Sequence, residues 1–252
     1  LSDDQSDLDI NFWADTIPPE AERVAWLQSL GVTDVKVGAI RQEDRSYPCS
    51  GVLDGVEVGC SWQSFTSLYF FIELITTAGE NEYHMLASRL YTFTSVLVQA
   101  IPVRTSGVLD RIQAQLAHYP DSVRSREIRE SISPRSQTTL LKGLQKALRY
   151  GDELMLIGWI ESGLSEVIKL LYPINRMWYP QDKWRYKLAA VLPLKPDDLY
   201  ERVGLALHDP DQSQRPLHLA RLLRDTLALI EKDDYDVSAT VSAIEAFIKE
   251  NE

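Results

Sequence analysis

Asp7 and Asp9 stand two positions apart near the start of the chain, in a segment where apolar and polar residues alternate. The alternation predicts a β-strand that buries Leu8, Ile10 and Phe12 on one face. Asp7 and Asp9 would then lie side by side on the other face, where two anions repel each other unless a cation lies between them. Mg²⁺ is the expected cation, because it binds one or two carboxylates and takes further ligands from water and substrate phosphates. The pair therefore predicts a site for phosphoryl transfer.

A third carboxylate stands in segment 55–62, which reads Gly-Val-Glu-Val-Gly-Cys-Ser-Trp. Its alternation predicts a second strand, with Glu57 on the same open side as Asp7 and Asp9. Clustered carboxylates raise one another's proton affinity, and a bound metal reverses that effect. The structural alternative is that Asp7 and Asp9 are solvated strand-edge residues and that Glu57 is an ordinary exposed strand residue. The chemical interpretation depends on the three residues acting together.

The run Ser6-Asp7-Leu8-Asp9-Ile10 resembles the Ser-Asp-x-Asp signature of the polymerase-β-like nucleotidyltransferases, which include the aminoglycoside and lincosamide nucleotidyltransferases. The resemblance implies that Asp7 and Asp9 hold Mg²⁺ and that Ser6 contributes to nucleotide binding. It implies that Glu57 is a further metal ligand, or the general base that takes the proton from an acceptor hydroxyl. It also implies ATP, or another nucleoside triphosphate, as co-substrate.

The Gly-Ser motif that precedes this signature in the family is absent from the chain, which begins with Leu1 rather than Met. In the family, that motif holds the triphosphate. We therefore expect truncation or disorder upstream of Leu1. If the natural protein begins at Leu1, the alternative is a nucleotide-binding or interaction module that no longer catalyses.

Composition limits the classes of partner. The chain has 252 residues, of which 44% are hydrophobic and 25% charged, as in an ordinary globular protein. Its 26 basic and 37 acidic residues give a net charge of -11, which argues against nucleic-acid binding and suits a neutral or cationic acceptor. The two cysteines and four histidines show no metal-ligand spacing. Glu73, Gly158 and Glu161 interrupt the apolar stretches, so we expect no membrane span and a cytoplasmic protein.

The order of elements predicts an α+β fold of two domains. In residues 1–115 we expect a nucleotidyltransferase domain with a mixed β-sheet, including a helix from Pro18 to Gly31 and a last strand around 94–101. Residues 116–252 are expected to form a helical bundle, because strand patterns disappear and helical periodicity dominates. The expected helices of that bundle are 135–150, 152–172, 183–191, 212–232 and 238–249.

Two features of the helical half carry a functional and a structural interpretation. Segment 172–184 is rich in aromatics and is similar to a region of aminoglycoside adenylyltransferases in which a lysine opens a helix toward the triphosphate; this makes Lys183 the candidate phosphate contact. The alternative is that Trp178, Tyr179 and Trp184 pack the bundle. Glu161 is the lone acid on an apolar stripe, and is either a carboxylate lining the cleft or a charge with a partner.

The expected activity is a Mg²⁺-dependent nucleotidyltransferase that moves a nucleoside monophosphate, AMP from ATP, to a hydroxyl of a small molecule such as an antibiotic. A homodimer is compatible with this, because several family members close their cleft with a second subunit. A further alternative is a protein-adenylylating enzyme of the toxin–antitoxin type, although such enzymes tend to be single small domains.

Overall fold

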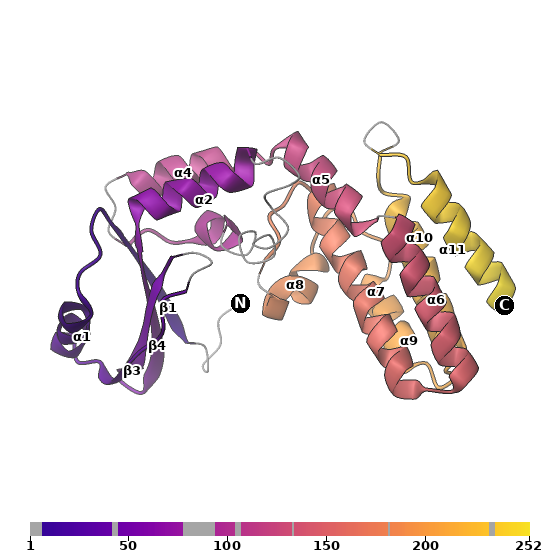
Figure 1. The fold of residues 1–252 in the computed structure, drawn as a ribbon, viewed down its shortest axis with the longest axis horizontal. Helices are drawn as coiled ribbons and strands as arrows, with labels where there is room; N and C mark the ends of the chain where they lie inside the picture. Colours follow the sequence, from indigo (N-terminus) through magenta and orange to yellow (C-terminus); the bar gives the residue numbers. More distant parts are fainter. Residues whose placement is uncertain are drawn as a thin grey trace. The chain divides into compact units, whose positions relative to one another are not determined.

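The computed structural model describes residues 7–41, 45–77, 94–103, 107–132, 134–180, 182–231 and 235–252, without the side chains of 77, 134–136, 182 and 183. The chain divides into two compact units, Leu1–Leu90 and Tyr91–Glu252. The described strands belong to the first unit, and the second unit is helical where it is described (Figure 1). The predicted α+β fold class is therefore confirmed.

The first unit is built on a four-stranded mixed sheet, in the order β1-β4-β3-β2. β1 pairs parallel with β4, and the other two pairs are antiparallel. Helix α1 connects β1 to β2, and α2 follows β4 directly (Figure 1). The bounds are β1 Leu8–Ala14, α1 Glu20–Ser29, β2 Thr33–Val37, β3 Tyr47–Leu53, β4 Val56–Ser64 and α2 Phe65–Thr77.

Local sequence explains the turns of this unit. Leu53 pairs with Val56, so Asp54 and Gly55 alone connect β3 to β4. Both have positive φ, 50° and 84°, as the type I′ turns favoured in two-residue hairpins require. Gly31, with a φ of 89°, follows the end of α1, so the predicted helix between Pro18 and Gly31 is confirmed.

The face of the sheet toward α1 forms the core of the first unit. Its buried residues are Leu27, Val32, Cys49, Val58 and Cys60, with Ile10 and Phe12 packed against them. Phe12 stacks on Trp62 with ring centroids 4.2 Å apart, and the edge of Trp26 meets Phe12 at 5.1 Å. The predicted burial of Ile10 and Phe12 thus holds in part, since both are half-buried. The predicted burial of Leu8 is wrong: it is 49% exposed, because it lies at the first position of β1, before the residues that pack on this core.

The second unit contains the remaining described helices. Their bounds are α4 Val108–Leu116, α5 Asp121–Ser131, α6 Pro134–Tyr150, α7 Glu153–Ile174, α8 Asp182–Ala189, α9 Leu199–His208, α10 Gln214–Leu227 and α11 Ser238–Asn251. The five predicted helices of the bundle are confirmed as α6, α7, α8, α10 and α11, whereas α5 and α9 were not predicted. In the part of the chain that is described, no helix is long and apolar enough to cross a membrane.

The predicted strand around 94–101 is wrong, because residues 94–99 are helical. Gln99 Nε2 donates to Ser95 Oγ at 2.9 Å, a contact between side chains one helical turn apart. Gln113 Nε2 from α4 donates to the carbonyl oxygens of Leu97 and Ala100 at 3.0 and 2.8 Å. These acceptors at the helix end gain a partner, so tertiary contacts override the β-branched composition of the segment.

The helical segment 94–99 also affects where the chain divides into two units. The sequence placed the division at residue 115, after a final strand. The compact units of the structure divide between Leu90 and Tyr91. Residues 91–115 therefore belong to the helical unit.

Helix α7 lies at the centre of the second unit, in contact with α5, α6, α8, α9 and α10. Its first turn is capped by Asp152, whose Oδ1 accepts from the backbone N–H of Met155 at 2.9 Å. Val167 and Leu171 are fully buried in the shared core. Gly143 of α6 allows α7 to approach closely, since a Cβ at this position would lie 2.2 Å from Cε2 of Trp159.

Gly143→Ala is expected to destabilise the chain by about 1–3 kcal/mol, because the indole of Trp159 is too large and rigid to yield without repacking. The measurement is the free energy of unfolding in urea. Gly158→Ala is the matched control: a Cβ there meets nothing within 4 Å, so the substitution should stabilise α7 by about 0.5–1 kcal/mol. Equal effects of the two alanines would contradict the close approach of α6 and α7.

Candidate active site

The parallel pairing of β1 with β4 positions the predicted site residues. Asp9 lies opposite Gly59, Asn11 opposite Ser61, and Trp13 opposite Gln63. Trp13 Nε1 donates to Gln63 Oε1 at 3.2 Å, so these two side chains point to the same side of the sheet. Because side chains alternate along each strand, that side is opposite to the stacked Phe12 and Trp62.

We call this side the polar sheet face, formed by Asp9, Asn11, Glu57, Gly59 and Ser61. Its burial increases along the strands: Asp9 and Glu57 are exposed, Asn11 and Ser61 are half-buried, and Gln63 beyond them is 3% exposed. The open end of the polar sheet face is therefore the end that carries the carboxylates.

Gly59 makes room for the carboxylate of Asp9. A Cβ at position 59 would lie 2.7 Å from Asp9 Oδ1, closer than side-chain carbons approach other atoms. A glycine within a strand often marks such a close approach. The sequence interpretation placed Gly59 on the open side but gave it no role, although its position within the strand was the available signal.

The other two predicted acids are near the same end. Asp7 precedes Leu8, whose partner in β4 is Val58, the residue after Glu57. Asp7 and Glu57 are both exposed. Among the residues that the structure describes, no three His, Cys, Asp or Glu side chains are grouped closely enough to hold a metal ion. The catalytic and metal-binding roles of Asp7, Asp9 and Glu57 remain predictions.

The chemistry of this end suits Mg²⁺ better than a softer metal. Its acidic groups offer hard carboxylate oxygens, and Mg²⁺ needs only one or two of them from a protein. Asp9 is an exposed carboxylate, the kind of single protein ligand that a hydrated Mg²⁺ accepts.

The strand pairing places two further residues in one row with Asp9 and Gly59 across the sheet. Gly59 lies opposite Ser50 of β3, and Ser50 opposite Lys36 of β2, so Lys36 ends the row at the far edge. Lys36 is exposed, and Ser50 is half-buried. Sequence reasoning did not connect these residues with Asp9, because the order of strands is not visible in a local pattern.

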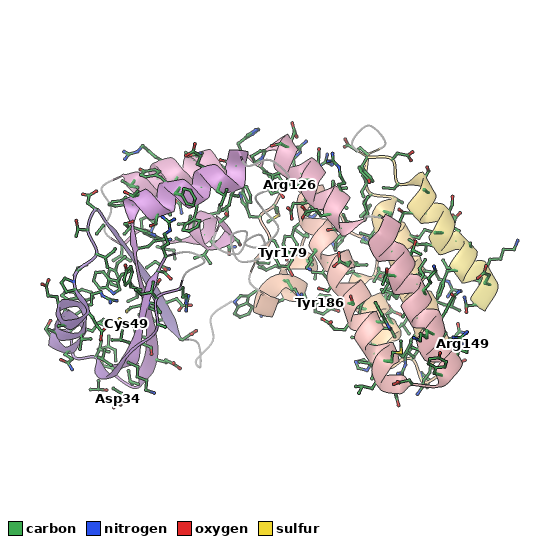
Figure 2. All side chains as sticks on the ribbon, viewed as in Figure 1. Asp34, Cys49, Arg126, Arg149, Tyr179 and Tyr186 are labelled. Carbon is green, nitrogen blue, oxygen red and sulfur yellow. The ribbon has the colours of Figure 1, made fainter. Side chains whose placement is uncertain are left out.

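The two cysteines lie on the opposite face of the sheet, next to each other on β3 and β4. Both are buried free thiols, and Cys49 lies within the sheet (Figure 2). Burial, with smaller contributions from the charges of Cys49 and Asp9, raises the pKa of Cys60 to about 11. The Cys60 thiol therefore stays protonated near neutral pH and is a poor nucleophile.

The two predicted nucleotide contacts are not described at the level of side chains. Ser6 lies outside the described residues, and only the backbone of Lys183 is described, in the first turn of α8. The predicted helix start at Lys183 holds, and its phosphate contact remains a prediction.

The structural alternatives hold for Trp178, Tyr179 and Glu161. Trp178 is buried, with Nε1 donating to the carbonyl of Leu116 at 2.8 Å. Tyr179, half-buried, meets Tyr172 edge-on, with ring centroids 5.2 Å apart. Glu161 is exposed and forms an ion pair with Arg185, with Nη2 and Oε1 3.4 Å apart. Glu161 is therefore the charge with a partner that the sequence left as one alternative.

Residues 88–185 match the model of a family described as a domain of unknown function, DUF4037. No curated protein matches the chain. Among solved structures, the chain is similar to a nucleotidyltransferase-like protein from Exiguobacterium sibiricum 255-15, with 11% identity and a TM-score of 0.43 over 92% of this chain and 80% of that one. A likeness at this level establishes no shared activity.

Gly59→Ala is expected to weaken Mg²⁺ binding about tenfold, because the new methyl group must displace the Asp9 carboxylate. The free energy of unfolding should change by less than about 1 kcal/mol, since the displaced group is exposed. Both are measured by titration calorimetry with MgCl₂ and by urea unfolding. Ser61→Ala is the control on the same face and should leave Mg²⁺ affinity unchanged. Equal Mg²⁺ affinity in wild type and Gly59→Ala would show that Asp9 is not the ligand.

Proposed function

We propose that this protein is a Mg²⁺-dependent nucleotidyltransferase that transfers AMP from ATP to a hydroxyl group of a small molecule. One observation carries the proposal: the carboxylate of Asp9, from β1, lies over Gly59 of β4. Glu57 is on the same strand and the same face as Gly59. The pairing of β1 with β4 thus gives acids from distant parts of the sequence a common face. Such a face suits binding of a metal–triphosphate complex.

In this proposal Asp7 and Asp9 hold Mg²⁺, while Ser6 and Lys183 contact the nucleotide. When bound, Mg²⁺ would neutralise charge on the phosphate oxygens and lower the barrier to displacement of pyrophosphate. Glu57 takes the proton from the acceptor hydroxyl while the hydroxyl oxygen attacks the α-phosphorus of ATP. Its exposure leaves its carboxylate accessible to an acceptor.

The overall charge of -11 favours a neutral or cationic acceptor over a polyanion. A hydroxylated cationic antibiotic, such as an aminoglycoside, fits this description, and nucleic acid does not. The proposal includes action in the cytoplasm, where ATP and Mg²⁺ are abundant, and leaves room for a homodimer.

Asp9→Asn is expected to weaken Mg²⁺-dependent binding of a non-hydrolysable ATP analogue on the order of 100-fold, about 2.7 kcal/mol. The amide keeps the size of the side chain and removes the charge that attracts the metal. Calorimetric titration with and without Mg²⁺ measures the effect. Asp34→Asn is the matched control, because it removes the same charge from the far edge strand and asparagine tolerates its φ of 52°.

Each outcome of that titration has a defined meaning. Binding that requires Mg²⁺, is lost in Asp9→Asn and persists in Asp34→Asn supports the transferase. Binding that is equal in all three proteins moves the nucleotide site away from Asp9. If the wild type does not bind the analogue at all, the transferase proposal fails and the chain is an inactive scaffold.

Glu57→Gln is expected to keep the affinity for the ATP analogue within about twofold and to slow pyrophosphate release about 10²–10⁴-fold, the usual contribution of a general base. Pyrophosphate release from ATP is measured with aminoglycosides as trial acceptors. A loss of nucleotide affinity together with turnover would instead make Glu57 a metal ligand. Unchanged affinity and turnover would remove Glu57 from the site.

A further inference from the structure

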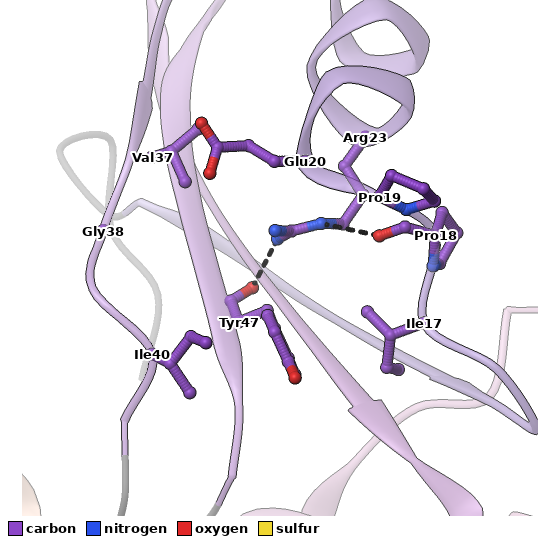
Figure 3. Close-up of a pocket in the computed structure, with 9 residues that line it drawn as sticks. All are labelled: Ile17, Pro18, Pro19, Glu20, Arg23, Val37, Gly38, Ile40 and Tyr47. Carbon is purple, nitrogen blue, oxygen red and sulfur yellow. Dashed lines mark hydrogen bonds between the residues drawn. The ribbon is translucent and has the colours of Figure 1, made fainter.

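A second candidate site lies in the first unit, in a cavity of about 260 Å³ between the entrance to α1 and the strands β2 and β3 (Figure 3). Tyr47 and Val37 are on the same face of the sheet as Cys49, opposite to the polar sheet face. The cavity is therefore separate from the proposed transferase site. It is lined by Ile17, Pro18, Pro19, Glu20, Arg23, Val37, Gly38, Ile40 and Tyr47.

Arg23 is the unusual group in this cavity, because an arginine that is only 4% exposed is rare without a counter-ion. Its Nε donates to the carbonyl of Pro18 at 3.2 Å, and its Nη1 donates to the carbonyl of Tyr47 at 3.3 Å (Figure 3). Nη1 also lies 3.4 Å from Cys49 Sγ, and the guanidinium lies 5.2 Å from the centroid of the Tyr47 ring. These contacts fix the guanidinium against the wall of the cavity.

Nη2 is the guanidinium nitrogen of Arg23 that these contacts do not use. Within the described chain, Nη2 donates to no acceptor, and no carboxylate lies within ion-pair distance of the guanidinium. Nη2 is not one of the buried polar atoms that lack a partner, so it reaches solvent and is accessible to a ligand. The structural role of Arg23, which ties the entrance of α1 to β3, uses Nε and Nη1 and does not require Nη2.

The N-terminus of α1 adds to the positive electrostatic potential that Arg23 creates in the cavity. Pro19 and Glu20 line the cavity at the N-terminus of this ten-residue helix, where free backbone N–H groups and the helix dipole favour an anion. Glu20 is the intramolecular competitor, since it is an exposed carboxylate one turn before Arg23. It forms no ion pair with Arg23 in the described structure, so the position beside Nη2 is open to a ligand.

We propose that this cavity binds a small monoanionic carboxylate with an apolar or aromatic body, held through Nη2 of Arg23. The carboxylate supplies the missing counter-charge, and Ile17, Ile40 and the ring of Tyr47 contact the body. The volume is below the ~300 Å³ at which pockets begin to hold drug-sized ligands, so the ligand is small. A single free nitrogen beside Glu20 suits one negative charge better than the two of a phosphate.

The test uses three probes on the wild-type chain: benzoate, the neutral isostere benzamide, and inorganic phosphate. Binding is followed by the NMR shifts of the Arg23 side chain and by calorimetry. The expected result is saturable binding of benzoate that shifts the Arg23 Nε–H signal, with no binding of benzamide. Saturable binding of phosphate in place of benzoate would overturn the choice of a carboxylate, and no saturable binding of benzoate would overturn the site.

Three variants locate the bound probe. Arg23→Met should abolish benzoate binding, and Ile40→Trp should do the same by filling the cavity while leaving every contact of Arg23 in place. The second variant decides the question if Arg23→Met does not fold. Glu20→Gln removes the competing charge at an exposed position, so it should raise benzoate affinity on the order of fivefold. Benzoate binding that is unchanged in both Ile40→Trp and Glu20→Gln would place the probe elsewhere and overturn the proposal.

Discussion

The parallel pairing of β1 with β4 is the constraint on which both faces of the sheet depend. It joins the strand that starts at Leu8 to the strand that starts at Val56. A slip of one residue would exchange the faces and bring Asp9 into the apolar core. The stacked rings of Phe12 and Trp62 on one face, 4.2 Å apart, and the hydrogen bond from Trp13 to Gln63 on the other oppose such a slip.

The same sheet separates two kinds of charge. Arg23 is buried on the face toward α1, whereas Asp9 is exposed on the other. Cys49 and Cys60 lie between them and respond to both: burial raises the pKa of Cys49, Arg23 lowers it in part, and Asp9 adds to the rise in the pKa of Cys60. Both thiols therefore remain protonated near neutral pH, and the row between the charged groups stays neutral.

Sequence patterns predicted what depends on local periodicity and missed what depends on tertiary contacts. The alternation around Asp9 and Glu57 gave both strands and their faces. It could not give the strand order that places Gly59 beside Asp9. Helix α5 was missed because its buried side includes Arg124, whose Nε donates to the carbonyl of Pro173 at 3.2 Å, and this does not produce an apolar stripe.

In the second unit, the polar and aromatic groups Tyr172, Arg185 and Glu161 contact one another. The proposed chemistry therefore depends mainly on residues of the first unit. Tyr172 donates its hydroxyl to the carbonyl of Arg185 at 2.6 Å, and the same arginine forms the ion pair with Glu161. Burial raises the pKa of Tyr172 well above its usual value, so its hydroxyl is a fixed donor and not an acid–base group. These contacts connect α7 to α8, and a nucleotide that bound the same groups would have to compete with them.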